Sequence, residues 1–121
     1  AFASYYTQVM PWLDPTTPAA SMHVDSITLT KPYVRRKYNY TATVVIKDES
    51  GNPVNGATVN GTFTVSGRNR STSAVTGAGG TAVLVYKSRR NDNGFSFCVT
   101  NVTHASITYN SADNVETCDT Y

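Results

Sequence analysis

Charged side chains are scarce in this sequence, at 15% of 121 residues, and long apolar runs are absent. No apolar segment approaches the roughly 20 residues that a membrane-spanning helix needs. No basic segment leads into an apolar one, as in a signal peptide. Hydrophobic residues still make up 40% of the chain, which is enough to fill a core. We therefore expect one folded domain that does not insert into a membrane.

Side chains that carry out catalysis are equally sparse. The two histidines, His23 and His104, lie far apart, and no Gly-x-Ser-x-Gly turn supplies a nucleophile. His104 lies next to a predicted strand end, where we expect it to form hydrogen bonds. Two histidines and two cysteines do not give the closely spaced ligands of a zinc site. We therefore predict no enzymatic activity, no cofactor and no bound metal.

Two glycine-containing segments resemble ligand-binding loops only in part. "DESGNP" offers Asp48, Glu49 and Ser50 as oxygen ligands for calcium, but the loop is short, and Asp48 is expected to cap the turn. "TGAGGT", residues 76–81, has the glycines of a phosphate-binding loop, but it leads into a strand and no lysine follows. We predict a turn with Gly51 at positive φ in the first segment and a hairpin in the second.

Residue types that favour strands dominate the chain. Residues 37–48 alternate so that one face holds Tyr38, Tyr40, Ala42, Val44 and Ile46. Similar alternation marks residues 22–30, with a register change after Val24, and residues 56–67, 82–87, 95–100 and 105–110. Turns, not helical runs, separate these segments. The pattern predicts an all-β fold, an immunoglobulin-like antiparallel β-sandwich of about seven strands.

The stretch from Asp48 to Phe63 is predicted to cross from one sheet to the other, and it carries a family resemblance. Its pattern V-x-I-K-D-x-x-G-N-P-V-x-G-A-T-V resembles the strand–turn–strand of bacterial immunoglobulin-like domains of the invasin and intimin type. "TGAGGTA" is similar to their second mark, Thr-Asp-x-x-Gly-x-Ala, with Gly77 in place of the aspartate. "FCVTNVTHASITYN" resembles C-terminal accessory domains of secreted bacterial hydrolases. The resemblance covers about residues 22–110 and implies an adhesin, a spacer or an attachment module.

The N-terminal residues differ from the rest. "FASYYTQVMPWL" is similar to the last helix of chymotrypsin-like serine proteases, chiefly in Trp12-Leu13. "DPTTPAAS" has the prolines and small residues of a linker. The resemblance implies that residues 1–21 are a short helical or irregular tail of a preceding catalytic domain plus a linker. The immunoglobulin-like domain would then occupy residues 22–121.

Charge is divided along the chain. Residues 31–90 contain all ten lysines and arginines but only Asp48 and Glu49 as acids, whereas both flanking segments are acidic. Such a basic middle could bind a polyanion. No dense basic run exists, so we expect instead that the acidic C-terminal tail lies across the basic sheet.

Cys98 and Cys118 are predicted to form a disulfide. If Phe97 and Val99 face the core, Cys98 faces outward on its strand, and the bond would pin the C-terminal tail over the outer face of the sheet. Four Asn-x-Ser/Thr sequons accompany this cysteine pair, at Asn39, Asn60, Asn69 and Asn101. Together these features predict a secreted, extracellular protein.

Candidate ligand-contacting residues are Tyr33 and Tyr109, which the core pattern does not explain, and Arg68 and Arg70 of the basic segment. We predict a non-catalytic C-terminal accessory domain of a larger secreted protein, a hydrolase such as a serine protease. Its partners would be the preceding catalytic domain and a polysaccharide or an extracellular protein, and not nucleic acid. The alternatives are a structural repeat of a cell-surface adhesin and a carbohydrate-binding module.

Overall fold

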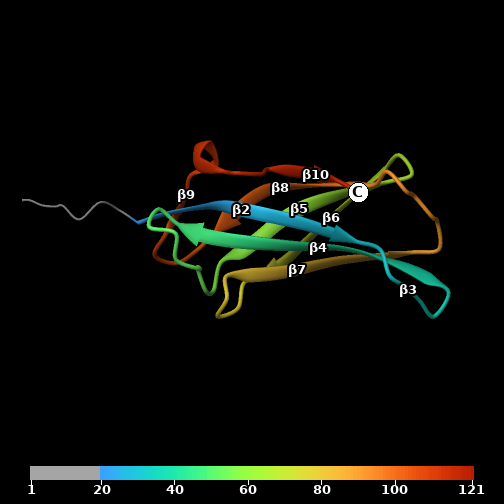
Figure 1. Cartoon of the computed structure of the whole chain (residues 1–121), viewed down its shortest axis with the longest axis horizontal. Coiled ribbons are helices and arrows are strands. Elements are labelled where there is room, and N and C mark those ends of the chain that lie inside the picture. The colour runs from blue at the N-terminus through green and yellow to red at the C-terminus, as the bar shows by residue number, and fades with distance from the viewer. Residues whose placement is uncertain (1–19) are drawn as a thin grey trace, which may run out of the picture.

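The computed structural model describes residues 20–121, so residues 1–19 of the predicted tail and linker (residues 1–21) lie outside the described residues. Six long strands are β2 (Ser21–Thr30), β4 (Lys37–Asp48), β5 (Thr58–Val65), β6 (Arg68–Val75), β7 (Thr81–Ser88) and β8 (Ser96–Thr103). Shorter elements are β3 (Tyr33–Val34), β9 (Thr108–Tyr109), β10 (Cys118–Thr120) and a 3-10 turn, η1 (Ser111–Asp113). The predicted all-β fold is confirmed (Figure 1).

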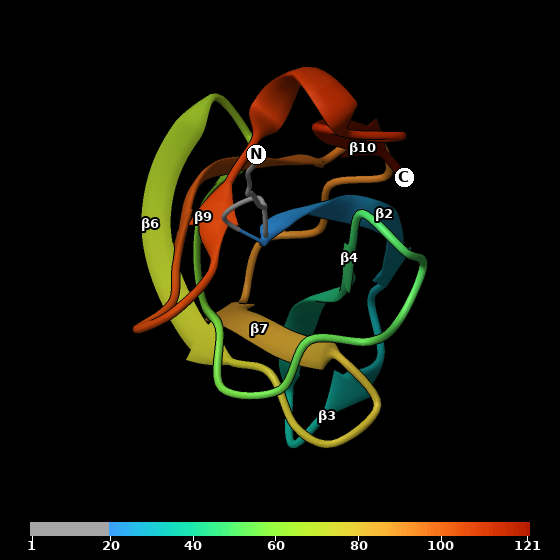
Figure 2. The ribbon, with the colours of Figure 1, turned by 90° about the vertical axis from the view of Figure 1, so that its left-hand side faces the viewer.

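The strands form two sheets that pack as the two layers of a sandwich (Figure 2). One sheet has the strand order β10-β8-β5-β6. In the other sheet β4 pairs with β2, β3 and β7, and β9 extends the sheet beyond β2. All pairs are antiparallel except β2 with β9. The predicted immunoglobulin-like sandwich is therefore confirmed, with one parallel pair that alternation along a strand cannot reveal.

Alternate residues from the two facing sheets fill the core. Strand β4 buries Tyr40, Ala42, Val44 and Ile46 completely, as its sequence pattern predicts. A β-bulge between Val24 and Ser26 shifts the register of β2, which confirms the predicted change in alternation. Aromatic rings meet between β5 and β8, where the centroids of Phe63 and Phe97 lie 4.8 Å apart. Burial of these apolar faces holds the two sheets together.

The turn after β4 crosses from one sheet to the other, as predicted. Oδ1 of Asp48 accepts hydrogen bonds from the backbone N–H groups of Ser50 and Asn52, each at 2.9 Å. Gly51 has a φ of 84°. The structure therefore confirms both the capping role of Asp48 and the positive φ of Gly51.

The glycine-rich segment between β6 and β7 also crosses between the sheets, so the predicted hairpin is wrong. Strand β6 pairs with β5, whereas β7 pairs with β4 in the other sheet. Gly80 packs against the crossing turn, since a Cβ there would lie 2.6 Å from the carbonyl oxygen of Ile46 and 2.9 Å from Cβ of Pro53. The buried hydroxyl of Thr76 donates to the carbonyl of Val54 at 2.6 Å. The two sequence marks of the family resemblance therefore pack against each other.

The predicted disulfide between Cys98 and Cys118 is confirmed. Cys98 alternates with the buried residues Phe97 and Val99 and faces outward. The tail does not lie over the outer face of the sheet, however, because Cys118 pairs directly opposite Cys98 within strand β10. The tail occupies the edge of β8, where backbone pairing holds it in the plane of the sheet. The predicted path of the tail is therefore wrong.

Strand β6 has no clear signal in the sequence. Its residues, "RNRSTSAV", are mostly exposed and polar and do not alternate with apolar ones. The strand nevertheless pairs with β5 along its whole length. Backbone pairing to a buried neighbour, not burial of its own side chains, therefore defines this edge strand.

Candidate ligand-binding end

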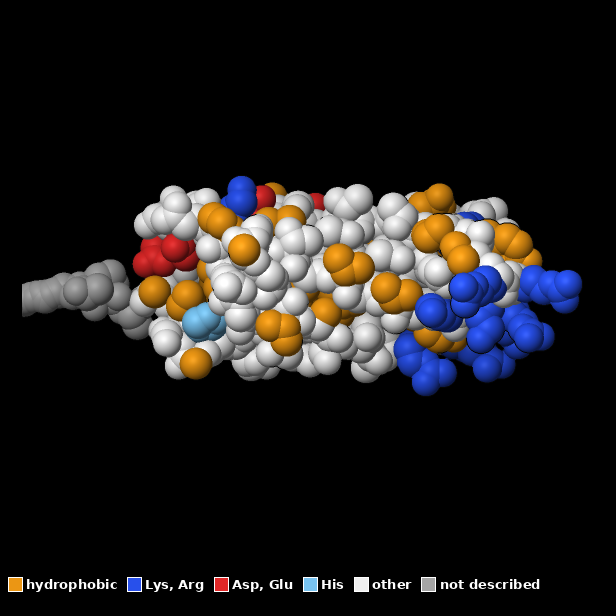
Figure 3. Space-filling model, turned by 90° about the horizontal axis from the view of Figure 1, so that it is seen from below, with side chains coloured by type: hydrophobic (Ala, Val, Ile, Leu, Met, Phe, Trp, Pro, Cys, Tyr) orange, Lys and Arg blue, Asp and Glu red, His pale blue; other side chains and the backbone are white. Residues whose placement is uncertain are grey.

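Nine of the ten lysines and arginines lie at one end of the sandwich, which we call the cationic end. The β3–β4 and β5–β6 hairpins and the loop between β7 and β8 meet there. Figure 3 shows these side chains gathered at one end of the long axis, with acidic side chains towards the other end. The nine residues are Lys31, Arg35, Arg36, Lys37, Arg68, Arg70, Lys87, Arg89 and Arg90.

Arg35 and Arg36 form the two-residue turn of the β3–β4 hairpin. Both have positive φ, at 54° and 65°. Such turns usually carry asparagine and glycine, because a side chain at positive φ is crowded by its own backbone. The neighbouring β5–β6 hairpin uses glycine at the second position of its turn, Gly67, with φ of 77°. The chain thus places two arginines where the local backbone disfavours them.

Tyr40 holds the loop between β7 and β8 from the core side. Its hydroxyl donates to the carbonyl oxygen of Arg90 and accepts from the backbone N–H of Asp92 at 2.9 Å. Burial raises the pKa of Tyr40, so the hydroxyl keeps the proton that it donates. The segment that carries Arg89 and Arg90 is therefore fixed in position by a buried group.

Asp92 ties the same loop to the β5–β6 hairpin. Its carboxylate accepts hydrogen bonds from the backbone N–H groups of Ser66 at 2.7 Å and of Gly94 at 2.9 Å. The bond from Ser66, then the bond from Gly94, and the nearby Lys31 ammonium lower the pKa of Asp92 below its ordinary value of 3.8. The carboxylate is therefore ionised and engaged by backbone groups.

Lys31 also forms hydrogen bonds with the loop between β7 and β8. Its ammonium donates to Oδ1 of Asn91 and Oδ1 of Asn93, each at 2.5 Å. The same ammonium lies 5.4 Å from the ring centroids of Tyr38 and Tyr121, within the range of cation–π attraction. Lys31 is therefore held by amide oxygens and aromatic rings, which do not neutralise its charge.

No ion pair involves any of the nine cations within residues 20–121. The ion pair that these residues do contain joins Lys47 to Asp25 at 3.3 Å, at the opposite end. The acidic tail follows β2 and β8, and the carboxylate of Glu116 accepts from the backbone N–H of Ile27 at 3.3 Å. The expectation that this tail covers the basic residues is therefore wrong. The cationic end presents uncompensated charge that attracts anions.

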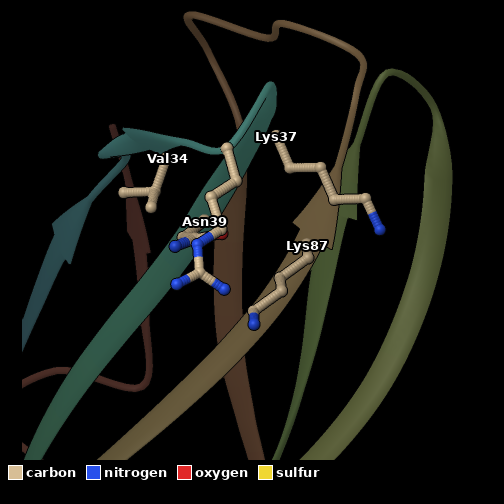
Figure 4. Close-up of a pocket in the computed structure, with 5 residues that line it drawn as sticks. Val34, Lys37, Asn39 and Lys87 are labelled. Carbon is tan, nitrogen blue, oxygen red and sulfur yellow. The ribbon is translucent and has the colours of Figure 1, made fainter.

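A shallow pocket of about 200 Å³ opens beside the β3–β4 hairpin (Figure 4). Asn39 and Lys87 are paired neighbours on β4 and β7, and Lys37 shares their outer face because strand residues alternate. The side chains that line the pocket are Val34, Arg35, Lys37, Asn39 and Lys87. Three cations, one amide and one apolar group therefore surround a hollow whose lining contains no acid.

Three of the four predicted ligand-contacting residues, Tyr33, Arg68 and Arg70, lie at the cationic end. The side chain of Tyr33 is 60% exposed, and its ring centroid lies 4.7 Å from that of Tyr38. Arg68 and Arg70 are exposed on β6. The guanidinium of Arg70 lies 5.3 Å from the ring centroid of Tyr86. None of these three residues lines the pocket.

The fourth predicted residue, Tyr109, lies apart from the others. It is half-buried on β9, which pairs with the start of β2 at the opposite end. Its hydroxyl accepts a hydrogen bond from Nδ2 of Asn114 at 2.7 Å. The structure therefore does not bring Tyr109 together with the other three candidates.

The sequence reasoning missed the pocket residues Arg35, Lys37 and Lys87. Arg35 and Lys37 belong to a hairpin that alternation alone did not identify, because β3 has only two residues. The usable signal was the Arg35–Arg36 pair itself, two large residues at a turn between strand-like runs. Lys87 is remote in sequence, and only the pairing of β4 with β7 brings it to the pocket.

Groups considered for other chemistry have structural partners. Nε2 of His104 lies 3.0 Å from the carbonyl oxygen of Asn55, and Nδ1 accepts from the backbone N–H of Ser106 at 3.0 Å, which confirms its predicted place at a strand end. In the part of the chain that the structure describes, no three residues among His, Cys, Asp and Glu come together to hold a metal. The same residues include no helix of the length and apolarity needed to cross a membrane.

Two facing sheets joined by crossing turns define an immunoglobulin-like domain. Residues 26–121 match the family model of the macroglobulin domain MG4, and the chain belongs to this family. No curated protein and no solved structure matches the chain. The immunoglobulin-like class predicted from the sequence is therefore confirmed. The finer resemblances, to invasin-type domains and to the last helix of a protease, are not confirmed.

Proposed function

We propose that this chain is a non-catalytic domain of a larger secreted protein, and that it attaches this protein to an acidic extracellular polymer. The observation that carries the proposal is the cationic end, where nine cations have no acidic partner within residues 20–121. Membership of the macroglobulin family and the Cys98–Cys118 disulfide support an extracellular setting. The resemblance of residues 2–13 to a protease helix supports a hydrolase, such as a serine protease, as the rest of that protein.

Attachment through this end follows from its electrostatics. Nine like charges held on one small surface repel one another, and a bound polyanion relieves that repulsion. Tyr40, Asp92 and Lys31 already fix the loop between β7 and β8 and its contact with the β5–β6 hairpin, so binding requires little reordering of the backbone there. Exposed charges are screened by salt, and binding is therefore expected to be strongest at low ionic strength.

Binding of the chain to an acidic polysaccharide, with a neutral polysaccharide of similar length for comparison, tests the proposal. We expect the acidic polymer alone to bind, and its affinity to fall steeply as the salt concentration rises from about 0.1 M to about 1 M, because the Debye length shortens from about 10 Å to about 3 Å. Titration calorimetry at several salt concentrations measures this dependence.

Two charge-reversal variants separate attachment by the cationic end from an effect of net charge. Arg89→Glu and Lys47→Glu change the net charge equally but lie at opposite ends of the sandwich. Arg89→Glu is expected to weaken binding about tenfold, and Lys47→Glu less than twofold. Equal losses would contradict attachment through the cationic end. Binding to neither polymer would favour a spacer or an adhesin repeat.

A further inference from the structure

We propose that the pocket beside the Arg35–Arg36 turn binds one sulfate ester group of a sulfated polysaccharide. This inference rests on the proposed attachment to an acidic polymer, and it specifies the chemical group that is recognised. Its basis is the pocket lining, the surface next to the pocket, and the backbone conformation of the turn.

The lining offers donors of three kinds to one anionic group. Arg35 supplies a planar guanidinium, Lys87 an ammonium group and Asn39 an amide N–H, whereas the ammonium of Lys37 is directed away from that of Lys87 (Figure 4). A tetrahedral oxyanion presents several oxygens in different directions, and donors from the β3–β4 turn, β4 and β7 can therefore bind it together. Hydrogen bonds between such cations and an ionised oxygen are short and strong. The absence of acidic residues from this lining leaves the anion without a competitor.

The size of the pocket limits what it can enclose. Its volume of about 200 Å³ is below the roughly 300–1,000 Å³ of sites that surround drug-sized ligands. It therefore accommodates one small group of a longer molecule, while the remainder of that molecule lies on the surface.

The surface next to the pocket distinguishes between classes of polyanion. Along β4 and β7 the outer face continues with Thr41 opposite Val85 and Thr43 opposite Val83. Val85 is 40% exposed and Val83 is 53% exposed. Figure 3 shows that the surface beside the cationic end is free of charged side chains in this view. A face of hydroxyl and methyl groups suits the hydroxyl and C–H groups of a sugar.

A nucleic acid fits this surface less well. It carries a phosphate on every nucleotide and binds where cations follow its backbone and exposed aromatic rings stack on its bases. Beyond Lys87 the outer positions of β7 are Val85 and Val83, neither of which is charged or aromatic. A polysaccharide with separated sulfate groups matches one cationic pocket followed by an uncharged path.

The conformation of the turn is an independent observation. Two arginines at positive φ destabilise a turn for which asparagine and glycine are well suited. A residue that destabilises its own turn is expected where its side chain has another use. For Arg35 that use is a place in the pocket lining.

Two charge-matched variants test the pocket directly. Arg35→Gln with Lys87→Gln removes two pocket cations, and Arg68→Gln with Arg89→Gln removes two cations outside the pocket lining. The ligands are a sulfated polysaccharide, its desulfated form and single-stranded DNA of similar length. Calorimetry is expected to show a loss of affinity for the sulfated polymer of about a hundredfold in the pocket variant and about tenfold in the other. Circular dichroism checks that both variants are folded.

Titration with inorganic sulfate identifies the residues at which a sulfate group binds. In NMR spectra of the parent chain, saturable shifts are expected at the amides of residues 34–39 and 87. These shifts should persist in the variant with substitutions outside the pocket and disappear in the pocket variant. Equal weakening of both variants, or sulfate shifts spread over the whole cationic end, would overturn the pocket assignment while leaving attachment by this end intact. Binding of DNA as tight as that of the sulfated polymer would overturn the polysaccharide assignment. No binding of any polyanion would overturn the proposed function itself.

Replacing the turn separates its structural role from its binding role. Arg35→Asn with Arg36→Gly installs the residues that a two-residue hairpin turn favours. We expect Tm to rise by a few degrees while affinity for the sulfated polymer falls well beyond the roughly tenfold loss of the Arg68→Gln, Arg89→Gln variant. A rise in Tm with binding equal to that of the Arg68→Gln, Arg89→Gln variant would show that the arginines have no special part in binding.

Discussion

At the end of the sandwich that holds the crossing turn, side chains form hydrogen bonds with the backbone, whereas at the cationic end the backbone is bonded but the arginines and lysines form no ion pair within residues 20–121. Asp48 caps the crossing turn, and the buried Thr76 bonds to the carbonyl of Val54. At the cationic end, Tyr40 and Asp92 likewise bind backbone groups of the loops. The arginines and lysines around them have no acidic partners in the described chain.

Under the proposed function, stability and binding therefore depend on different residues. The crossing turns hold the two sheets together through close packing and hydrogen bonds. At the cationic end, Tyr40 and Asp92 order the loops through hydrogen bonds to the backbone. The arginine and lysine side chains have no acidic partner in the described chain. Substitutions at the first end should therefore change stability without changing binding. Substitutions in the framework of the second end should change both.

The largest effect is expected at Gly80, between the two crossing turns. Its φ is 73°, and a Cβ at this position would lie 2.6 Å from the carbonyl oxygen of Ile46, so there is no room for a side chain. Gly80→Ala should lower the free energy of unfolding by about 3 kcal/mol, from positive-φ strain and displacement of backbone. Urea denaturation measures this loss.

Gly77→Ala is the matched control in the same segment, because a Cβ at Gly77 meets no atom within 4 Å. Its free energy of unfolding should change by less than about 1 kcal/mol. Anion binding by folded Gly80→Ala should equal that of the parent chain. A weakened affinity would show that the two ends are coupled.

A smaller effect, on both properties, is expected from Tyr40→Phe. The substitution removes the hydroxyl that bonds to Arg90 and Asp92, and it leaves both backbone groups without their partner. We expect a loss of about 2 kcal/mol in the free energy of unfolding. Affinity for an acidic polymer should fall a few-fold, because the loop that carries Arg89 and Arg90 is no longer fixed.

Tyr86→Phe supplies the control for this prediction. Its ring packs beside Tyr40, with 6.1 Å between centroids, but its hydroxyl takes no part in the network around the loop. Stability and affinity should both stay close to those of the parent chain. If Tyr40→Phe lost stability but kept full affinity, the loop would not depend on this hydroxyl for its binding geometry.

Much of the fold could be predicted because strands with one buried face alternate apolar and polar residues in the sequence. The alternation of β4, the register change in β2 and the outward-facing Cys98 all follow from which residues are apolar. Strands β6 and β10 could not be found in this way, since backbone pairing defines both and their side chains are largely exposed. The prediction of a hairpin at residues 76–81 was wrong for a related reason. Glycines indicate a turn, but they do not indicate whether the strands on either side pair with each other.

The candidate site was less accessible to sequence reasoning. The excess of positive charge in residues 31–90 was visible, but its concentration at one end depends on strand direction and pairing. Asn39 and Lys87 become neighbours only through the pairing of β4 with β7. Tyr109, chosen for an aromatic ring that the core pattern left unexplained, proved to be a half-buried partner of Asn114. Exposure and proximity, the properties that make a site, arise from tertiary structure.

The smallest effect is expected at Asp92, and it should depend on pH. Its folded-state pKa is lowered by bonds from Ser66 and Gly94, so the stability that it contributes is complete well above its ordinary pKa of 3.8 and is lost as the pH falls through the lower folded value. Each carboxylate oxygen accepts one of these bonds, and an amide can replace only one of them. Asp92→Asn should therefore lower the free energy of unfolding by about 1 kcal/mol near neutral pH. The difference in free energy of unfolding between this variant and the parent chain should become smaller below about pH 4.

Asp48→Asn at the other end provides the comparison for Asp92→Asn. Both backbone bonds of Asp48 go to a single oxygen, Oδ1, which an asparagine retains. Its substitution should therefore leave stability almost unchanged near neutral pH, although both aspartates cap turns. Urea unfolding at several pH values measures how the free energy of unfolding of the parent chain and of each variant depends on pH. A gap between Asp92→Asn and the parent chain that stayed constant down to about pH 3 would show that ionisation of Asp92 is not what stabilises the cationic end.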